Sequence, residues 1–176
     1  MKRSSVLFLT LFALPSAAHA AGGFSVGVEG GVMEFNSRAS LNEAGMAWGL
    51  RAGFRLLGPT RLEARFLSAG HELGGNTVNL RQGSALLHVA LLPGRRTTPY
   101  AFAGVGMRMS STDLPGQMGE SALIVPFGGG FDIAFGDHIL LAPEFTWHHR
   151  ATQSSMGVPP IGGDTWNVSL VFKLEV

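Results

Sequence analysis

The chain contains no cysteine, few charged residues and, outside its first twenty residues, no long apolar run. The absence of cysteine excludes disulfide bonds as a source of stability. Charged residues make up 14% of the sequence, whereas soluble domains carry roughly 25%, so the charge is too sparse to coat an ordinary water-facing surface. No later segment has the roughly 18 consecutive apolar residues that indicate a membrane-spanning helix. A chain with this little charge and no spanning helix is typical of a β-barrel in a membrane.

The first twenty residues have the pattern of a secretory signal peptide. Lys2 and Arg3 precede an apolar run over residues 6–14, and the small residues Ala18 and Ala20 follow. This pattern predicts export and cleavage after Ala20, which divides the chain into a signal peptide, 1–20, and a mature domain, 21–176. The mature domain retains 11 basic and 12 acidic residues. This near neutrality gives no reason to expect nucleic acid as a partner.

The mature sequence alternates between apolar residues and small or charged ones. Within 46–56, Trp48 and Leu50 occupy one set of alternate positions, and Gly49 and Arg51 occupy the other. Because successive side chains of a strand point to opposite faces, this segment is predicted to be a strand with one apolar face. The pattern recurs and predicts an all-β fold, an eight-stranded antiparallel up-and-down transmembrane β-barrel. The strands are expected at 24–34, 46–56, 61–67, 80–92, 99–109, 122–135, 139–148 and 166–176.

The predicted connections alternate in length. Short turns are expected at 57–60, 93–98 and 136–138, and long loops at 35–45, 68–79, 110–121 and 149–165. Short turns at the periplasmic rim and long loops at the extracellular rim are the arrangement of bacterial outer-membrane barrels, so both ends of the mature domain are expected at the periplasmic rim. Aromatic residues near strand ends are expected at the membrane interfaces, namely Trp48, Tyr100, Trp147 and Trp166.

A soluble eight-stranded barrel with its apolar face turned inward would show the same alternation. However, the charge is too sparse for a water-facing outer wall. The apolar face also carries bulky side chains, such as Phe54, Phe127 and Phe172, which exceed the space in a narrow lumen. The opposite face carries the glycines that a tight interior requires. The pattern therefore favours an apolar face turned toward lipid.

Four segments connect the chain to a known family: residues 99–106, the glycines 128–130 followed by Phe131, the pair Glu144–Phe145, and the last strand with Phe172, Leu174 and Val176 at alternate positions. On these segments, residues 21–176 resemble the small eight-stranded outer-membrane β-barrel proteins of the OmpA and OmpX type. The resemblance implies contact with outer-membrane lipid and recognition of the last strand by the barrel-insertion machinery. It indicates little about the biochemical role, because one fold carries many functions.

Charged residues on the polar faces of the predicted strands are expected inside the barrel. Because an unpaired buried charge is costly, they should form ion pairs across the lumen. An eight-stranded barrel is barely wide enough for its own side chains, so the network should fill the lumen. The alternative is a narrow gated pore whose ion pairs rearrange. The predicted lumen network comprises Glu29, Arg51, Arg55, Glu63, Arg65, Arg108, Asp132, Glu144 and Lys173.

No motif in the sequence predicts a catalytic residue, a cofactor or a metal site. His148 and His149 are adjacent on a predicted strand and should face opposite sides, so they cannot share a metal ion. Some outer-membrane barrels that deacylate lipid A have a His and a Ser two residues apart near the last strands. Here Arg150 and Ala151 lie two residues beyond the two histidines, so that motif is absent.

Glycine and proline residues within the predicted strands have structural interpretations. The clusters at 104–106 and 128–130 lack the following helix or Gly-Lys-Ser/Thr of a phosphate-binding loop and are interpreted as lumen glycines. Pro126 and Pro143 remove ladder hydrogen bonds, and local bulges are expected there.

The sequence therefore predicts a non-enzymatic protein of the bacterial outer membrane, exported through a cleaved signal peptide. Its expected role is structural, or an interaction through four extracellular loops with a partner that the sequence does not identify. A small gated ion or solute pore and a lipid A-modifying enzyme are the alternatives.

Overall fold

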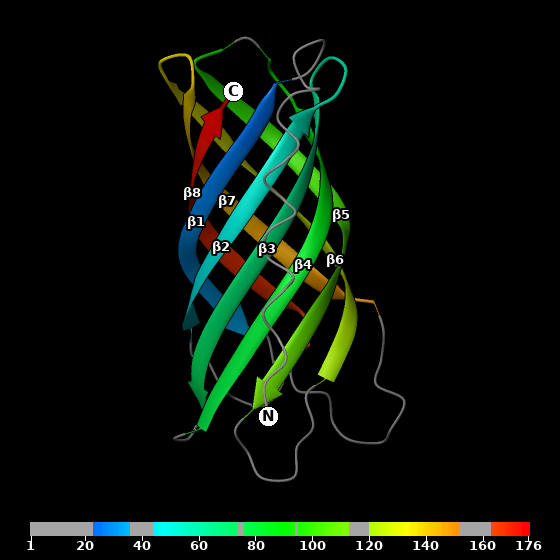
Figure 1. Ribbon diagram of the computed structural model, residues 1–176. Helices are drawn as coiled ribbons and strands as arrows, with labels where there is room; N and C mark the ends of the chain where they lie inside the picture. Colours follow the sequence, from blue (N-terminus) through cyan, green and yellow to red (C-terminus); the bar gives the residue numbers. More distant parts are fainter. Residues whose placement is uncertain (1–22, 36–43, 74–75, 94, 113–119, 152–162) are drawn as a thin grey trace, which may run out of the picture.

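The computed structural model describes residues 23–35, 44–73, 76–93, 95–112, 120–151 and 163–176. The predicted signal peptide lies outside these residues. The described chain forms β1 (Phe24–Phe35), β2 (Ala44–Arg55), β3 (Thr60–Leu73), β4 (Asn76–Ala90), β5 (Thr97–Thr112), β6 (Glu120–Phe135), β7 (Ile139–Arg150) and β8 (Thr165–Glu175). These strands are tilted around a single barrel (Figure 1), which confirms the predicted fold class.

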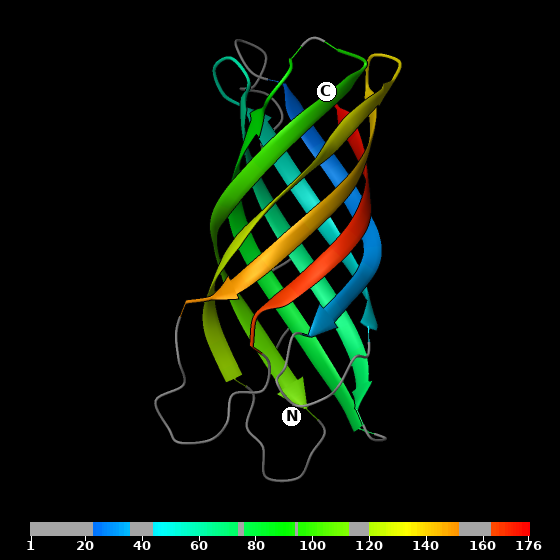
Figure 2. The same cartoon turned by 180° about the vertical axis from the view of Figure 1, so that it is seen from behind.

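The barrel is closed by its first and last strands. Each strand pairs antiparallel with the next, and β8 pairs with β1; Figure 2 shows β8 between β7 and β1. At one end, the Phe24 amide donates to the Val176 carbonyl (3.1 Å) and the Val176 amide donates to the Phe24 carbonyl (2.8 Å). Within the described residues, closure leaves no open sheet edge along the wall, as hydrocarbon requires.

No helix among the described residues is long and apolar enough to cross a membrane.

The two faces of the strands differ as predicted. Along β2, Trp48 and Leu50 are more than half exposed, whereas Arg51 between Leu50 and Ala52 is 4% exposed. The same alternation holds on β4, where Leu87 faces outward and His88 is buried. The outer wall is therefore mainly apolar, and most charged residues of the described strands lie inside, with Arg81 on β4 as an exposed exception.

The turns at one end of the barrel are short. They comprise residues 56–59, 91–96 and 136–138, and we call this end the short-turn rim. Gly58 (φ 63°) and Gly136 (φ 77°) adopt the left-handed backbone conformation that favours glycine. The C-terminus lies at this rim (Figure 1), as expected. The opposite end is the long-loop rim, and most of its connections lie outside the described residues.

The predicted long loop at 68–79 is wrong. β3 continues to Leu73 and β4 begins at Asn76, with Leu73 paired to Asn76. The prediction ended these strands where outward residues such as Ser68 and Asn79 stop being apolar. A strand that continues beyond the hydrocarbon no longer needs an apolar outer face, so hydropathy underestimates its length. As a result, β3 to β6 extend farther at the long-loop rim than the other strands (Figure 1).

The predicted bulges at the two strand prolines are also wrong. Pairing between β5 and β6 is interrupted near Pro126 but resumes in the same register, from Ala103↔Phe127 to Gly106↔Ile124. Pairing between β6 and β7 is likewise interrupted near Pro143 without a change of register. Each proline therefore coincides with a gap in the ladder and adds no extra residue to its strand.

The predicted aromatic residues occupy two different environments. Trp48 is 56% exposed on the outer face and lies beside Phe66, with ring centroids 5.9 Å apart. Trp147 and Trp166 are partly exposed and paired across β7 and β8 near the long-loop rim. Tyr100 is a correction, because it is 4% exposed and inside the barrel. It is paired with Gly130, which has no side chain and so leaves room for the inward phenol ring.

Candidate functional site

Arg51 lies at the centre of the lumen and contacts carboxylates from three other strands. Its guanidinium donates to Glu29 on β1, to Glu63 on β3 (3.2 Å) and to Glu144 on β7 (2.7 and 2.8 Å). All four side chains are at most 1% exposed. A charge-assisted hydrogen bond is stronger than a neutral one, so this cation links the opposite walls of the barrel.

Arg65 is paired with Arg51 across the β2–β3 ladder and holds the same carboxylates from the other side. Its Nε and Nη2 donate to the two oxygens of Glu29, both at 2.7 Å, and its Nη1 donates to Thr146 at 3.0 Å. Two neighbouring guanidinium groups repel each other, but the carboxylates between them offset this repulsion. Tyr100 completes the cluster by donating to Glu144 at 2.8 Å.

A second group of ion pairs lies next to the first, toward the short-turn rim. Lys173 donates to Asp132 at 2.8 Å, and Arg61 contacts Asp132 at 3.5 Å. His88 lies 3.4 Å from Glu63 and stacks on Phe102, with ring centroids 4.9 Å apart. Glu63 joins the two groups, because it also contacts Arg51.

We call the two groups together the charge layer. It has four cations and four carboxylates, which balance: Arg51, Arg61, Arg65 and Lys173 with Glu29, Glu63, Asp132 and Glu144. A buried cluster without net charge avoids the large cost of an uncompensated ion.

The lumen is filled on the long-loop side of the charge layer as well. Gln82, His148 and Asn167 form a buried polar group, with His148 2.8 Å from the Asn167 side-chain oxygen and 3.2 Å from Gln82. An apolar cluster, which we call the long-loop plug, lies inside the same half and comprises Met33, Ala47, Leu67, Ala69 and Leu80. The residues on the inward face were expected to be polar, so this apolar plug was not predicted.

The predicted lumen residues do not all lie together. Seven of them, Glu29, Arg51, Glu63, Arg65, Asp132, Glu144 and Lys173, are in the charge layer. Arg108 is buried elsewhere and donates to the Gly163 carbonyl at 3.1 Å. Arg55 is a correction: its side chain is 56% exposed at the short-turn rim and pairs with Glu175 at 3.2 Å. It belongs to the polar face of β2 but lies at the end of the strand.

Two residues that contact the carboxylates of the charge layer, Arg61 and Tyr100, were missing from the predicted lumen network. Arg61 occupies the same set of alternate positions on β3 as Glu63 and Arg65, so the sequence already indicated that it faces the lumen. Tyr100 shares the inward face of β5 with Phe102, but its position near a strand end led to the interfacial assignment.

The adjacent histidines face opposite sides, as predicted. His148 is fully buried in the lumen, whereas the His149 side chain is 57% exposed and lies 3.2 Å from Asp164. The Asp164 carboxylate also accepts from the Arg150 backbone amide at 2.9 Å. Ala151, two residues beyond His149, has no side-chain group able to act as a nucleophile.

The chain belongs to the family described as outer membrane protein beta-barrel domain, whose model matches residues 4–173. No curated protein matches the chain. Among solved structures it is similar to Neisserial surface protein A, with a TM-score of 0.69 and 12% identity over 88% of this chain and 97% of that one.

Two further similar structures have different roles in their names. One is Ail, the attachment invasion locus protein of Yersinia pestis, in complex with the heparin analogue sucrose octasulfate, with a TM-score of 0.56 and 10% identity over 88% of this chain and 96% of that one. The other is the outer membrane enzyme PagL, with a TM-score of 0.55 and 14% identity over 86% of this chain and 99% of that one. At these identities the similarity concerns the fold, and the protein is an outer-membrane β-barrel of the bacterial type.

Arg51 and Arg55 provide a matched test of the charge layer, because they lie on the same face of β2. Arg51→Ala leaves buried carboxylates uncompensated and should lower the free energy of unfolding by about 3–5 kcal/mol. Arg55→Ala removes only an exposed ion pair and should cost less than about 1 kcal/mol. Urea titration in lipid vesicles, followed by heat-modifiable gel migration, measures both. Equal losses for the two variants would contradict a role of the charge layer in stability.

Proposed function

We propose that this protein is a non-enzymatic outer-membrane barrel with a structural or surface-interaction role. In this proposal the short-turn rim faces the periplasm and the long-loop rim faces the cell exterior, as in other bacterial barrels. The observation that carries it is the filled lumen. The charge layer and the long-loop plug together occupy the interior with buried side chains, so the groups available to other molecules lie at the ends of the barrel.

The uneven height of the barrel supports an interaction at the long-loop rim. In the described residues, β3 pairs with β2 only as far as Gly70, and β6 pairs with β7 only from Ile124. The strands β3 to β6 nevertheless continue to Leu73, Asn76, Thr112 and Glu120. A sheet that extends beyond the wall offers backbone groups to a partner, and strand addition at an edge is a common mode of recognition.

The observations support an enzyme less well. The exposed pair of His149 and Asp164 resembles the base and orienting acid of a hydrolase, but a nucleophile is also required. Ala151 does not supply one. The serines at 154 and 155 lie outside the described residues.

The pore alternative predicts conductance, and the filled lumen predicts none. When the purified mature protein is inserted into a planar bilayer, we expect no discrete current steps. Glu144→Gln should also leave the bilayer silent, because Thr146, Tyr100 and the long-loop plug remain in place. Heat-modifiable migration of the inserted sample is the control for folding. Steps in the native protein that Glu144→Gln or Arg108→Ala abolishes would contradict the proposal and support a gated pore.

The surface-interaction role is tested by shortening the protruding sheet. In a variant, residues 70–79 are replaced by a short Asn-Gly turn, which joins β3 to β4 within the wall. Cells that display the native protein should adhere to epithelial monolayers or glass more than cells with an empty vector, and the shortened variant should lose most of this gain. Surface-exposed epitope staining verifies equal display.

Arg55→Ala is the matched control for that experiment, since it alters only the opposite rim, and it should adhere like the native protein. Lipid A from the same cells should have an unchanged mass spectrum. Equal adhesion of native and empty-vector cells would contradict the interaction role. A lost acyl chain in lipid A would contradict the non-enzymatic one.

A further inference from the structure

A cavity of about 360 Å³ opens at the short-turn rim, on the far side of the charge layer from the long-loop plug. We call it the short-turn pocket. Its walls come from the short-turn ends of β2 to β8 and from the turn residues Gly58, Pro59, Pro93 and Arg95. The volume is in the range of small-molecule sites. Because the charge layer closes its inner end, the pocket is blind and offers a place to bind rather than a path through the barrel.

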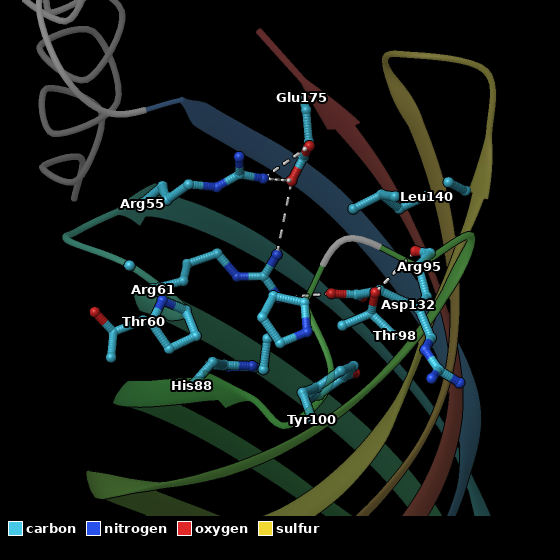
Figure 3. Close-up of a pocket in the computed structure, with 15 residues that line it drawn as sticks. Arg55, Thr60, Arg61, His88, Arg95, Thr98, Tyr100, Asp132, Leu140 and Glu175 are labelled. Carbon is cyan, nitrogen blue, oxygen red and sulfur yellow. Dashed lines mark hydrogen bonds and ion pairs between the residues drawn. The ribbon is translucent and has the colours of Figure 1, made fainter.

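Cations outnumber carboxylates on the walls of the short-turn pocket. Arg55, Arg61 and Arg95 line it, together with Asp132 and Glu175. Arg61 and Asp132 belong to the balanced charge layer, so Arg55 and Arg95 against Glu175 leave one cation in excess on the walls. Figure 3 shows Arg55 and Arg61 reaching from the β2–β3 side toward Glu175 and Asp132. The field in the pocket therefore favours a ligand with negative charge.

Arg61 is held loosely. Its nearest carboxylate oxygens are at 3.5 Å in Asp132, 3.9 Å in Glu63 and 4.0 Å in Glu175, and its Nε has no hydrogen-bond partner although that atom is buried. Arg65, two inward positions farther along β3, makes hydrogen bonds of 2.7 Å to Glu29. A guanidinium presents several donors in a fork that suits an oxoanion. Arg61 thus donates one long hydrogen bond, from Nη2 to Asp132 at 3.5 Å, and its Nε donates to no protein acceptor.

The walls around Arg61 are fixed by their own hydrogen bonds. The Thr60 hydroxyl donates to the Leu57 carbonyl at 2.7 Å, and the Thr98 hydroxyl donates to the Arg95 carbonyl at 3.0 Å. Tyr100 donates to Glu144. Since these hydroxyl protons are used, the side-chain donors left for a ligand are those of the guanidinium groups and of the His88 ring, whose nitrogens have no hydrogen-bond partner. A pocket whose turns are held in place before binding loses less entropy when a ligand enters.

Apart from His88, the rest of the lining is apolar and includes Pro59, Pro93, Ala134 and Leu140. We propose that the short-turn pocket binds a small organic anion, with its carboxylate or phosphate group on Arg61 and its apolar part against this lining. The proposal does not depend on the surface role above, since it concerns the other rim and a different class of ligand.

The test uses the full mature protein in lipid nanodiscs at low salt, with 4-fluorobenzoate as the probe and fluorine NMR as the readout. We expect saturable binding, displaced by benzoate but not by the neutral isostere benzamide. Competition with inorganic phosphate distinguishes the two kinds of anion. If phosphate displaces the probe, the pocket binds oxoanions in general; if it does not, the pocket is selective for carboxylates.

Arg61→Gln should weaken binding roughly tenfold to hundredfold, because it removes a charged hydrogen-bond donor. Arg81→Gln is the matched control, since Arg81 is exposed on the outer wall of β4 and should have no effect. Leu140→Trp fills the pocket without removing a charge and should abolish binding. Heat-modifiable migration verifies that each variant is folded.

Three results would overturn the proposal. These are the absence of saturable binding, equal displacement by benzamide and benzoate, and equal affinities of folded Arg61→Gln, Leu140→Trp and Arg81→Gln. None of them bears on adhesion by the long-loop rim, so the two proposals fail separately.

Discussion

The structure depends on the contact between Arg51 and the three carboxylates Glu29, Glu63 and Glu144 in the centre of the barrel. Closing eight strands into a ring gives a lumen just wide enough for side chains, and the inward positions of β1, β2, β3 and β7 place charges at one level. Each of these ions would be costly alone. Their mutual neutralisation makes the interior compatible with the apolar outer wall, and the same contacts close the lumen.

The closed lumen separates the two ends of the protein. The long-loop rim has an uneven edge in which β3 to β6 extend beyond the wall (Figure 1), and we assign the surface role to it. The short-turn rim has a blind pocket with a loosely held guanidinium. Because the charge layer lies between them, an event at one rim has no open route to the other. This arrangement favours a barrel that binds other molecules separately at its two ends, and it argues against a conducting pore.

The sequence was sufficient to predict which residues form the outer wall, but not the whole arrangement of the interior. Alternation places Leu50 outside and Arg51 inside without further information, because a strand has only two faces. The prediction fails where a constraint other than the two-faced strand acts on the chain. Ser68 and Asn79 lie on strands that continue beyond the hydrocarbon, where hydropathy carries no signal. Tyr100 lies on the inward face by alternation, but its place near a strand end suggested the membrane interface; Gly130 opposite it leaves space for the ring. Arg65 makes short hydrogen bonds and Arg61 does not, and this difference depends on side-chain geometry that the sequence pattern does not predict.

The central claim is that the charge layer acts as one neutral unit, and a double-mutant cycle between Arg51 and Glu144 tests it most directly. Urea unfolding in vesicles measures Arg51→Met, Glu144→Gln and the double variant. The double variant loses one charge of each sign and stays neutral, so it should be more stable than the sum of the two single losses implies, by about 1–3 kcal/mol. Additive losses, with no coupling between the two sites, would contradict the account.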